Sequence, residues 1–365
     1  SDGTATAKIT NNLSNRNLVI NGEMRVAQRG TSSSEAAGGY TCDRFQVAPT
    51  GADEAPTQTQ HALTSSDTGP WAKGFRKSLH VQNGNQTSGA GAADNLRILY
   101  KFEGQDIVTS GWDYTSASSY ITLSFWVKSS VAQNFYGQLR NLDGTKQNYP
   151  FETGSLTADT WTKITKTIPG NSNIEIVDDN TNGLQLSWWI WNGTDKTGSV
   201  TLDQWAAYNS AVRVPDMTST WWTTNDATFE ITGVQLEVGE VATDFEHRTY
   251  HDEFLRCARY YQQLGGHAQF VGRGASNTQA DFTVPLVVPL RASPTVSKTH
   301  SYYRGFDPTN AGNSTNTPTV FTWSAYHNYL TFNLTGFSSS AGVEDDKCLT
   351  IQQWNDGITI LDSEL

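Results

Sequence analysis

The sequence has little of what a disulfide-bonded, nucleic-acid-binding or membrane-spanning protein requires. Only three cysteines occur among the 365 residues, and Cys42, Cys257 and Cys348 are too widely spaced for a disulfide framework or a C-x-x-C metal pair. The 36 acidic residues outnumber the 25 Lys and Arg, giving a net charge of −11. This balance argues against a nucleic-acid partner, because neutralising phosphates needs clustered Lys and Arg. No uncharged apolar run reaches ~18 residues, so we expect no membrane span and no secretory signal peptide.

Short catalytic motifs are also missing. The sequence contains no G-x-S-x-G, H-E-x-x-H or P-loop pattern. The seven histidines stand singly, and we interpret them as surface or packing residues rather than metal ligands. Two adjacent carboxylate pairs, Asp178-Asp179 and Asp345-Asp346, leave glycan cleavage or calcium binding open as alternatives to solvated loop residues. The sequence therefore predicts no enzyme and no cofactor, with structural calcium as an alternative.

What the chain has in abundance is aromatic residues, with 12 Trp, 14 Tyr and 15 Phe, while charged residues make up only 17%. This composition favours an all-β protein. Apolar and polar residues alternate in segments that recur every ~10–15 residues between turn signals, which is typical of a β-sandwich. The segments expected to form strands before the helix are 17–28, 40–47, 78–84, 95–104, 120–130, 134–144, 160–170, 184–193, 200–210 and 229–238, the last with a bulge near Gly233.

One segment changes period and predicts a helix. From residue 250 the apolar positions recur every three to four residues, Thr249 or His251 precedes the first turn, and Gly265-Gly266 ends it. The apolar face, which we expect to pack between domains or subunits, consists of Phe254, Cys257, Ala258 and Tyr261.

The expected organisation has four parts. Residues 1–16 form a polar arm, 17–248 a jelly-roll domain, 249–265 a connecting helix, and 266–365 a smaller C-terminal β-sandwich at the tip. Within the last part, residues 304–318 are rich in Asn, Thr and Gly and predict an exposed loop, either a binding loop or a tolerated insertion.

Blocks of the sequence resemble bacteriophage tail-fibre and other virion appendage proteins. NLVINGEMRVAQRGTS and YTCDRFQV near the start match opening motifs of that family, and VPLVVPLRASPTVS matches its segment after the helix. ITLSFWVKSS is similar to a core strand of carbohydrate-binding-module-like jelly rolls. The longest match is ITGVQLEVGEVATDFEHRTYHDEFLRCARYYQ, in which the matching positions are Gln235, Leu236, Glu237, Gly239, Ala242, Thr243, Phe245, Glu246, Arg259, Tyr260 and Tyr261.

We expect a non-enzymatic protein that attaches to a host polysaccharide or lipopolysaccharide. The resemblance implies a virion protein, assembled in the host cytoplasm. It also implies a homotrimer, and we expect the 1–16 arm to join other virion proteins. No coiled-coil heptads accompany these motifs, so a long shaft is not expected. Two alternatives stay open, a purely structural capsid-decorating or tail-connecting protein and a glycan depolymerase.

Aromatic rings are the candidate glycan contacts, because an exposed ring face can stack on a sugar. In a regular strand the adjacent Trp188 and Trp189 must point to opposite faces, which leaves one of them outside the core. The residues we predict to contact glycan are Trp189, Trp221, Trp222, Tyr302 and Tyr303.

Overall fold

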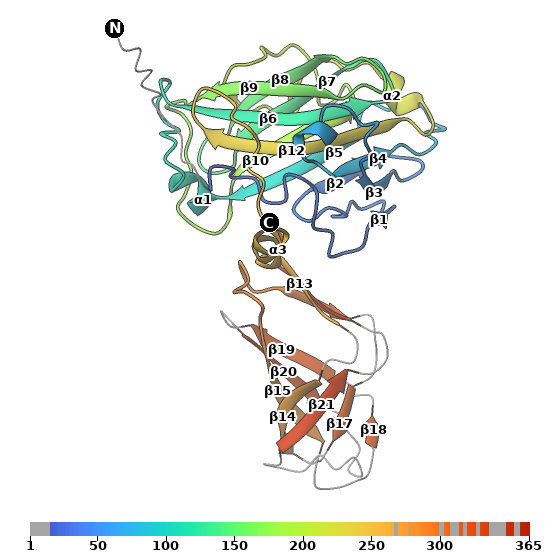
Figure 1. Cartoon of the computed structure of the whole chain (residues 1–365), viewed down its shortest axis with the longest axis vertical. Coiled ribbons are helices and arrows are strands. Elements are labelled where there is room, and N and C mark those ends of the chain that lie inside the picture. The colour runs from blue at the N-terminus through green and yellow to red at the C-terminus, as the bar shows by residue number, and fades with distance from the viewer. Residues whose placement is uncertain are drawn as a thin grey trace. The chain divides into compact units, whose positions relative to one another are not determined.

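The computed structural model describes residues 15–265, 269–276, 278–298, 303–306, 314–316, 320–325, 329–335, 348–353 and 358–365. The chain divides into two compact units, Ser1–Glu253 with Leu365 and Phe254–Glu364. Each unit has its own hydrophobic core, and strands dominate both (Figure 1). No helix in the described part of the chain has both the length and the apolar character needed to cross a bilayer.

The first unit consists of two six-stranded antiparallel sheets. Sheet A has the order β1-β3-β4-β12-β6-β9, and its strands are β1 Ser32–Ser33, β3 Thr57–Ala62, β4 Lys77–Gln82, β12 Thr228–Val238, β6 Tyr120–Ser129 and β9 Thr162–Pro169. Sheet B has the order β11-β8-β7-β10-β5-β2, and its strands are β11 Ala206–Ala207, β8 Gln147–Ser155, β7 Asn134–Asn141, β10 Asn182–Asn192, β5 Asn95–Glu103 and β2 Gln46–Thr50. Short helical turns lie between strands: η1 Trp71–Lys73, α1 Gly104–Val108 and α2 Thr220–Thr223.

The core lies between the two sheets and follows from the alternation in the sequence. In β6 the fully buried apolar side chains are Ile121, Leu123, Phe125 and Val127, and in β10 they include Leu184, Leu186, Trp188 and Ile190. The opposite side chains of the same strands point to the outer faces. The predicted all-β jelly-roll sandwich is therefore confirmed.

The predicted bulge in β12 is present at Gly233. The pairing of β12 with β6 shifts register between Thr232 and Gln235. Gly233 has φ of +62°, and a Cβ there would lie 2.6 Å from the ring of Phe75. The left-handed backbone and the close ring together explain why glycine stands here.

Three strand predictions are wrong in part. Residues 17–28 are buried but irregular, and their turn is held by Asn21, whose side-chain amide bonds the backbone of Val26 and Asp43. The expected strand over 40–47 begins only at Gln46. The expected closing strand over 200–210 is reduced to the two residues of β11. These segments bond to strands at isolated points, such as Leu18 N–H to the Leu236 carbonyl and Asp203 N–H to the Pro150 carbonyl, and do not form continuous ladders.

The helix α3, Tyr250–Ala258, is shorter than predicted. Thr249 caps it, because its Oγ1 accepts a hydrogen bond from the Asp252 backbone N–H at 3.2 Å. Residues beyond Ala258 turn into strand β13, Tyr261–Leu264, so Tyr261 lies in a sheet and not on the helix. Cys257, Ala258 and Tyr261 are buried and Phe254 is half-buried, while their packing between domains or subunits stays a prediction.

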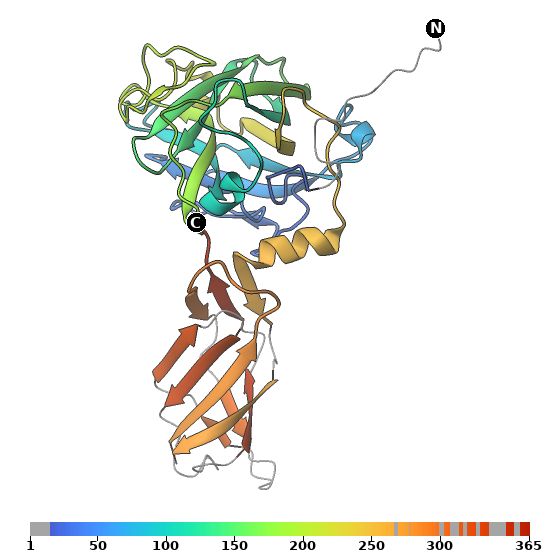
Figure 2. The same ribbon diagram turned by 90° about the vertical axis from the view of Figure 1, so that its left-hand side faces the viewer.

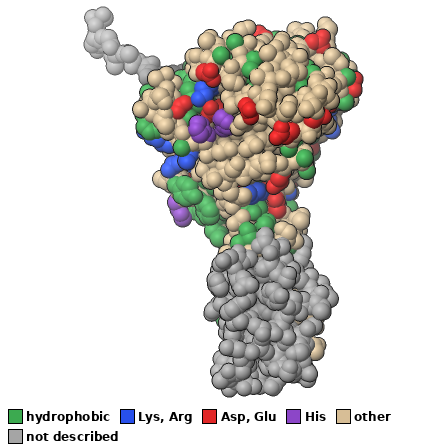
Figure 3. Space-filling view, turned by 90° about the vertical axis from the view of Figure 1, so that its right-hand side faces the viewer, with side chains coloured by type: hydrophobic (Ala, Val, Ile, Leu, Met, Phe, Trp, Pro, Cys, Tyr) green, Lys and Arg blue, Asp and Glu red, His purple; other side chains and the backbone are tan. Residues whose placement is uncertain are grey.

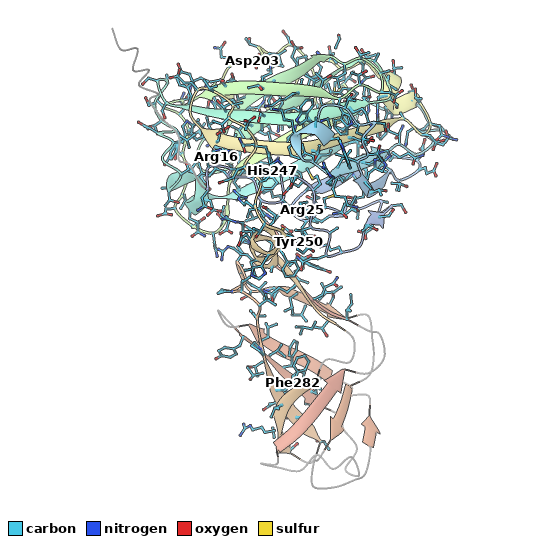
Figure 4. The ribbon with its side chains drawn as sticks, viewed as in Figure 1. Arg16, Arg25, Asp203, His247, Tyr250 and Phe282 are labelled. Atoms are coloured by element: carbon cyan, nitrogen blue, oxygen red, sulfur yellow. The ribbon has the colours of Figure 1, made fainter. Side chains whose placement is uncertain are left out.

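The second unit contains a three-stranded and a seven-stranded sheet (Figure 2). The small sheet has the order β13-β22-β16, with β22 Thr359–Asp362 and β16 Thr295–Lys298. The large sheet has the order β18-β17-β21-β14-β15-β20-β19, and its strands are β18 Ser314–Asn316, β17 Tyr303–Phe306, β21 Cys348–Gln353, β14 Gln269–Ser276, β15 Gln279–Pro285, β20 Tyr329–Thr335 and β19 Val320–Ala325. Phe282, labelled in Figure 4, stacks between Phe270 and Phe332 in its core.

Several predictions fall on residues outside the described ranges: most of the 1–16 arm, Tyr302, and the pair Asp345-Asp346. The 304–318 segment is described only in part. There β17 and β18 pair antiparallel, Tyr303 with Asn316, so the segment contains strands and is not a single loop.

Candidate functional site

The outer face of sheet B carries an ordered array of polar and aromatic side chains. Its central strand β10 pairs with β5 on one side and β7 on the other. One row across these strands consists of Arg97, Trp189 and Tyr136, because Trp189 is the register partner of both others. The second row, two residues before Trp189 in β10, contains Ser187 and its register partner Gln138. The third row consists of Lys101, Gln185 and Arg140.

Trp189 is covered by two arginines. The guanidinium carbon of Arg97 lies 5.1 Å from its ring centroid and that of Arg213 lies 5.4 Å away. Trp188 points to the opposite face and packs in the core against Phe45 and Phe125, so the pair does split between faces as alternation requires. However, Trp189 is fully buried. Its ring supports guanidinium groups and cannot itself stack on a sugar.

A third guanidinium completes what we call the arginine cluster, Arg97, Arg140 and Arg213. The Arg140 carbon lies 4.4 Å from the centroid of Tyr208. Arg140 donates to the side-chain oxygen of Gln185 at 3.1 Å, and Arg213 donates to the Ser210 carbonyl at 3.2 Å. All three arginines and Tyr208 keep part of their surface in solvent.

The cluster carries positive charge without an internal counter-ion. Among the described residues, no carboxylate lies within ion-pair distance of its guanidinium groups. Burial, and then the charges of Arg213 and Arg140, lower the pKa of Arg97 to about 10. Burial also lowers the pKa of Arg140, opposed by Tyr208 and reinforced by Arg213. Each guanidinium therefore lies in the positive field of the others.

Several buried polar atoms on this face have no hydrogen-bond partner within the protein. Gln138 is fully buried, yet neither its amide nitrogen nor its oxygen is bonded. The Nε atoms of Arg97 and Arg140 and the side-chain oxygen of Asn148 are in the same state. Buried polar groups are normally paired, so these atoms are exceptions, but like the Trp189 ring they are closed to a ligand as the side chains stand.

The predicted sugar contacts Trp221 and Trp222 are core residues instead. Both are fully buried in α2. The indole N–H of Trp221 donates to Thr228 at 2.9 Å and that of Trp222 to Gly89 at 3.0 Å, and Trp222 stacks on Trp191. Their ring faces are not available to a sugar, so that prediction is wrong for these two. Tyr303 lies in β17, and Tyr302 lies outside the described residues.

Sheet A carries a different cluster on its outer face. His80, Glu230 and Lys128 form a row across β4, β12 and β6, and His61 of β3 also reaches Glu230. The ligand atoms of His61, His80 and Glu230 lie within 4.8 Å of one another, which could in principle hold a metal ion. However, the Lys128 ammonium lies 3.0 Å from the carboxylate and already neutralises it. The arrangement fits an ion-pair network better than a metal centre.

These histidines were predicted to stand singly, which is wrong for His61 and His80, whose rings are 5.3 Å apart. Neighbouring histidine, acidic and basic side chains are visible on the face of the first unit in Figure 3. The pairing of β3 with β4 and of β4 with β12 brings the residues together. Nothing in the local sequence around either histidine shows that pairing.

A cavity of about 270 Å³ lies on the same sheet, between β6 and the link that follows β12. Trp126, Phe245 and His247 contribute rings to it, and Lys163 contributes a charge. His247, labelled in Figure 4, bonds Glu23 at 3.1 Å and the Lys73 carbonyl at 2.9 Å. Aromatic side chains therefore form part of the wall of this cavity.

The two longest blocks of the family resemblance meet in space. Arg16, also labelled in Figure 4, donates to Thr243 at 2.9 Å, and the backbone N–H of Asn17 donates to Glu246 at 3.0 Å. The backbone N–H of Asn21 donates to Glu253. Hydrogen bonds therefore join the opening segment to the link after β12.

Fold and site together define an all-β sandwich with a cationic, aromatic sheet face. No family model matches the sequence, and no curated protein matches it. Solved structures that resemble the chain include the enzymatically active domain of tailspike protein 4 of bacteriophage CBA120, at a TM-score of 0.32 and 10% identity, covering 61% of this chain and 21% of that one.

Two carbohydrate-binding modules are also similar to it. The N-terminal cellulose-binding domain of Cellulomonas fimi β-1,4-glucanase C has a TM-score of 0.29 at 8% identity, covering 59% of this chain and 97% of its own. The family 11 module of Clostridium thermocellum, in complex with a mixed-linked tetrasaccharide, has a TM-score of 0.26 at 10% identity, covering 55% and 91%. At such low scores and identities, these likenesses carry no conclusion about the function of this chain.

Proposed function

We propose that this protein is a non-enzymatic bacteriophage virion protein that attaches to a glycan of the host surface through the outer face of sheet B. The single observation that carries the glycan assignment is the part-exposed arginine cluster, whose guanidinium groups lie over Trp189 and Tyr208. Sugar hydroxyls are both donors and acceptors, so they can accept from guanidinium N–H groups. The partly exposed rings of Tyr136 and Tyr208 offer apolar surface beside them.

The virion assignment rests on the sequence blocks, which resemble tail-fibre and appendage proteins in order along the chain. From the same resemblance we propose a homotrimer, with the 1–16 arm joining other virion proteins and the virion as its location. Host polysaccharide or lipopolysaccharide is the proposed partner.

Binding of the purified chain to immobilised bacterial polysaccharides and lipopolysaccharides tests the glycan assignment. Arg213→Gln is the informative variant because the Arg213 side chain keeps part of its surface in solvent and lies over Trp189, 5.4 Å from the ring centroid. We expect this variant to stay folded and to bind glycan more weakly.

The matched control is Arg76→Gln. Arg76 also lies over a tryptophan, with its guanidinium carbon 3.7 Å from the centroid of Trp71, but it directly precedes β4 of sheet A and is not part of the sheet B face. It should leave glycan binding unchanged. If the folded chain binds no bacterial glycan, attachment is not its role, and a structural role in decorating or connecting virion parts takes its place. Release of new reducing ends from a bound polysaccharide would instead show a depolymerase.

A further inference from the structure

We infer that the arginine cluster binds an acidic group of the glycan, either the carboxylate of an acidic sugar or the phosphate of a phosphorylated one. This inference rests on the proposed function and narrows it to acidic glycans. It is carried by three observations on the outer face of sheet B: how the guanidinium groups are held, what charges surround them, and which neutral groups lie beside them.

Aromatic rings of the protein hold the guanidinium groups in place. Arg97 and Arg213 both lie against the fully buried ring of Trp189, and Arg140 lies against Tyr208. Aromatic faces attract cations and restrict their motion. A guanidinium so placed still presents N–H groups at its edge, in the planar fork that matches a carboxylate or a phosphate.

Composition does not explain why three arginines meet without a carboxylate. The chain has 36 acidic against 25 basic residues, and two other part-buried cations, Lys128 and Arg248, lie within ion-pair distance of a glutamate. Another charged side chain lies beside the cluster. Lys101 lies in the same row as Arg140 and donates to the Leu365 carbonyl.

Two acids whose charges act on Tyr136 are bonded to groups outside the arginine cluster. Glu152 is the register partner of Tyr136 and accepts from Asn134 at 2.6 Å. Asp216 accepts from Thr197 at 2.7 Å. Gathering like charges in a half-buried place is unfavourable unless an opposite charge joins them. An acidic ligand supplies that charge.

Neutral aromatic groups beside the cluster favour a sugar over a bare anion. Tyr136 is the register partner of Trp189, and Tyr208 lies against Arg140. Both rings are partly exposed. A sugar ring that carries one acidic group could contact these aromatic rings and the guanidinium groups together.

Paired probes that differ only in charge test this inference. Oligogalacturonate is compared with the same oligosaccharide after its carboxylates are reduced to alcohols, and a phosphorylated lipopolysaccharide core with its dephosphorylated form. We expect the purified full chain to bind at least one acidic member roughly tenfold or more tightly than its neutral partner. The arm that shows the preference identifies the source of the acidic group. Added salt should weaken that binding more than any binding to the neutral form.

Substitutions identify the residues that produce the preference for the acidic glycan. Arg97→Gln and Arg213→Gln should each reduce the acidic-to-neutral ratio by roughly tenfold, while Arg76→Gln should leave it unchanged. Arg97→Lys keeps the charge but loses the fork, so it should recover only part of the ratio. If a variant unfolds, ¹⁵N spectra of the arginine side chains in the parent protein provide a second test. The Nε signals of Arg97 and Arg140 should shift when the acidic probe is added and should not shift with its neutral partner.

The results distinguish failure of the acidic preference from failure of glycan attachment. Binding of acidic and neutral members with equal affinity would overturn the inference and leave glycan attachment standing. If no glycan of either kind binds to the folded chain, both the attachment role and its acidic preference are overturned.

Discussion

Arg97 and Trp189 are register partners on adjacent strands, and the guanidinium of one lies over the ring of the other, 5.1 Å from its centroid. Arg213 lies 5.4 Å from the centroid of the same ring. The sequence pattern places Trp189 on the outer face of the sheet, but Arg97 and Arg213 of the same protein cover its ring. Its role is to hold cations at the surface, and the surface chemistry of this face is that of guanidinium and amide groups.

Replacing Trp189 by alanine should destabilise the first unit strongly. Removal of a buried tryptophan typically costs about 3–5 kcal/mol through lost burial and the cavity left behind. Denaturant unfolding followed by tryptophan fluorescence measures this, because most tryptophans lie in the first unit. Trp126→Ala is the control, because Trp126 is half-exposed on the outer face of sheet A and should cost only about 1 kcal/mol. Equal losses for the two would mean that Trp189 is not covered as described.

Gly233→Ala should destabilise more than an ordinary turn substitution. An L-residue at a left-handed φ costs roughly 1–2 kcal/mol, and displacing the Phe75 ring from the new Cβ adds about 1–3 kcal/mol. Gly154→Ala is a matched control, since its φ of +70° is similar but nothing lies within 4 Å of the added Cβ. The difference between the two free energies of unfolding isolates the ring contact. No difference would show that Phe75 moves aside freely.

Thr249→Ala should loosen the first turn of α3. The Thr249 hydroxyl accepts from the Asp252 backbone N–H and donates to the Asp252 carboxylate at 2.7 Å. Losing such a cap costs about 1 kcal/mol, so hydrogen exchange of the Asp252 amide should accelerate roughly fivefold. Thr249→Ser keeps the hydroxyl and should exchange like the parent. Acceleration in both variants would point to lost methyl packing instead.

Local patterning predicted the parts of this structure that depend on one strand at a time. Alternation over 121–127 gave the correct buried face of β6, and Gly233 marked the bulge. It failed at Tyr261, whose spacing from Cys257 fits a helix although the residue lies in β13. It also failed at Trp222, because a polar neighbourhood does not reveal that the indole N–H finds a backbone partner in Gly89.

The candidate site could not be read from the sequence, because it depends on register between distant strands. Arg97 and Arg140 come from β5 and β7, and Arg213 from the segment that follows β11, more than seventy residues along the chain from Arg140. Each looks like an ordinary surface cation in its own segment. Only the pairing of β10 with both β5 and β7 puts two of them on one face. The same holds for His61 and Glu230 on sheet A.

The ion-pair network on sheet A makes stability depend on pH in two directions. Burial acts to raise the pKa of Glu230, but hydrogen bonds from His61, His80 and Ser78 outweigh it and hold the pKa far below the ordinary 4.5. The hydrogen bond to Glu230 raises the pKa of His61 above 6.5, and the one to Glu23 does the same for His247.

The sign of each contribution follows from linkage. A histidine with a raised pKa stabilises the fold fully below pH 6.5, and this stabilisation is lost as the pH rises through the folded-state value. A carboxyl with a lowered pKa stabilises the fold above pH 4.5, and this is lost on acidification. These two effects together should place the maximum between those pH values, with a decline on the alkaline side from the histidines.

Denaturant midpoints of the first unit between about pH 5 and pH 9 measure this dependence. The double variant His61→Gln with His247→Gln should flatten the alkaline decline, because the groups that lose their proton there are gone. His251→Gln serves as the control, since His251 is exposed and belongs to neither ion pair. An alkaline decline that persists unchanged in the double variant would assign the pH dependence to other groups, and the two histidine–glutamate pairs would then contribute nothing measurable to stability.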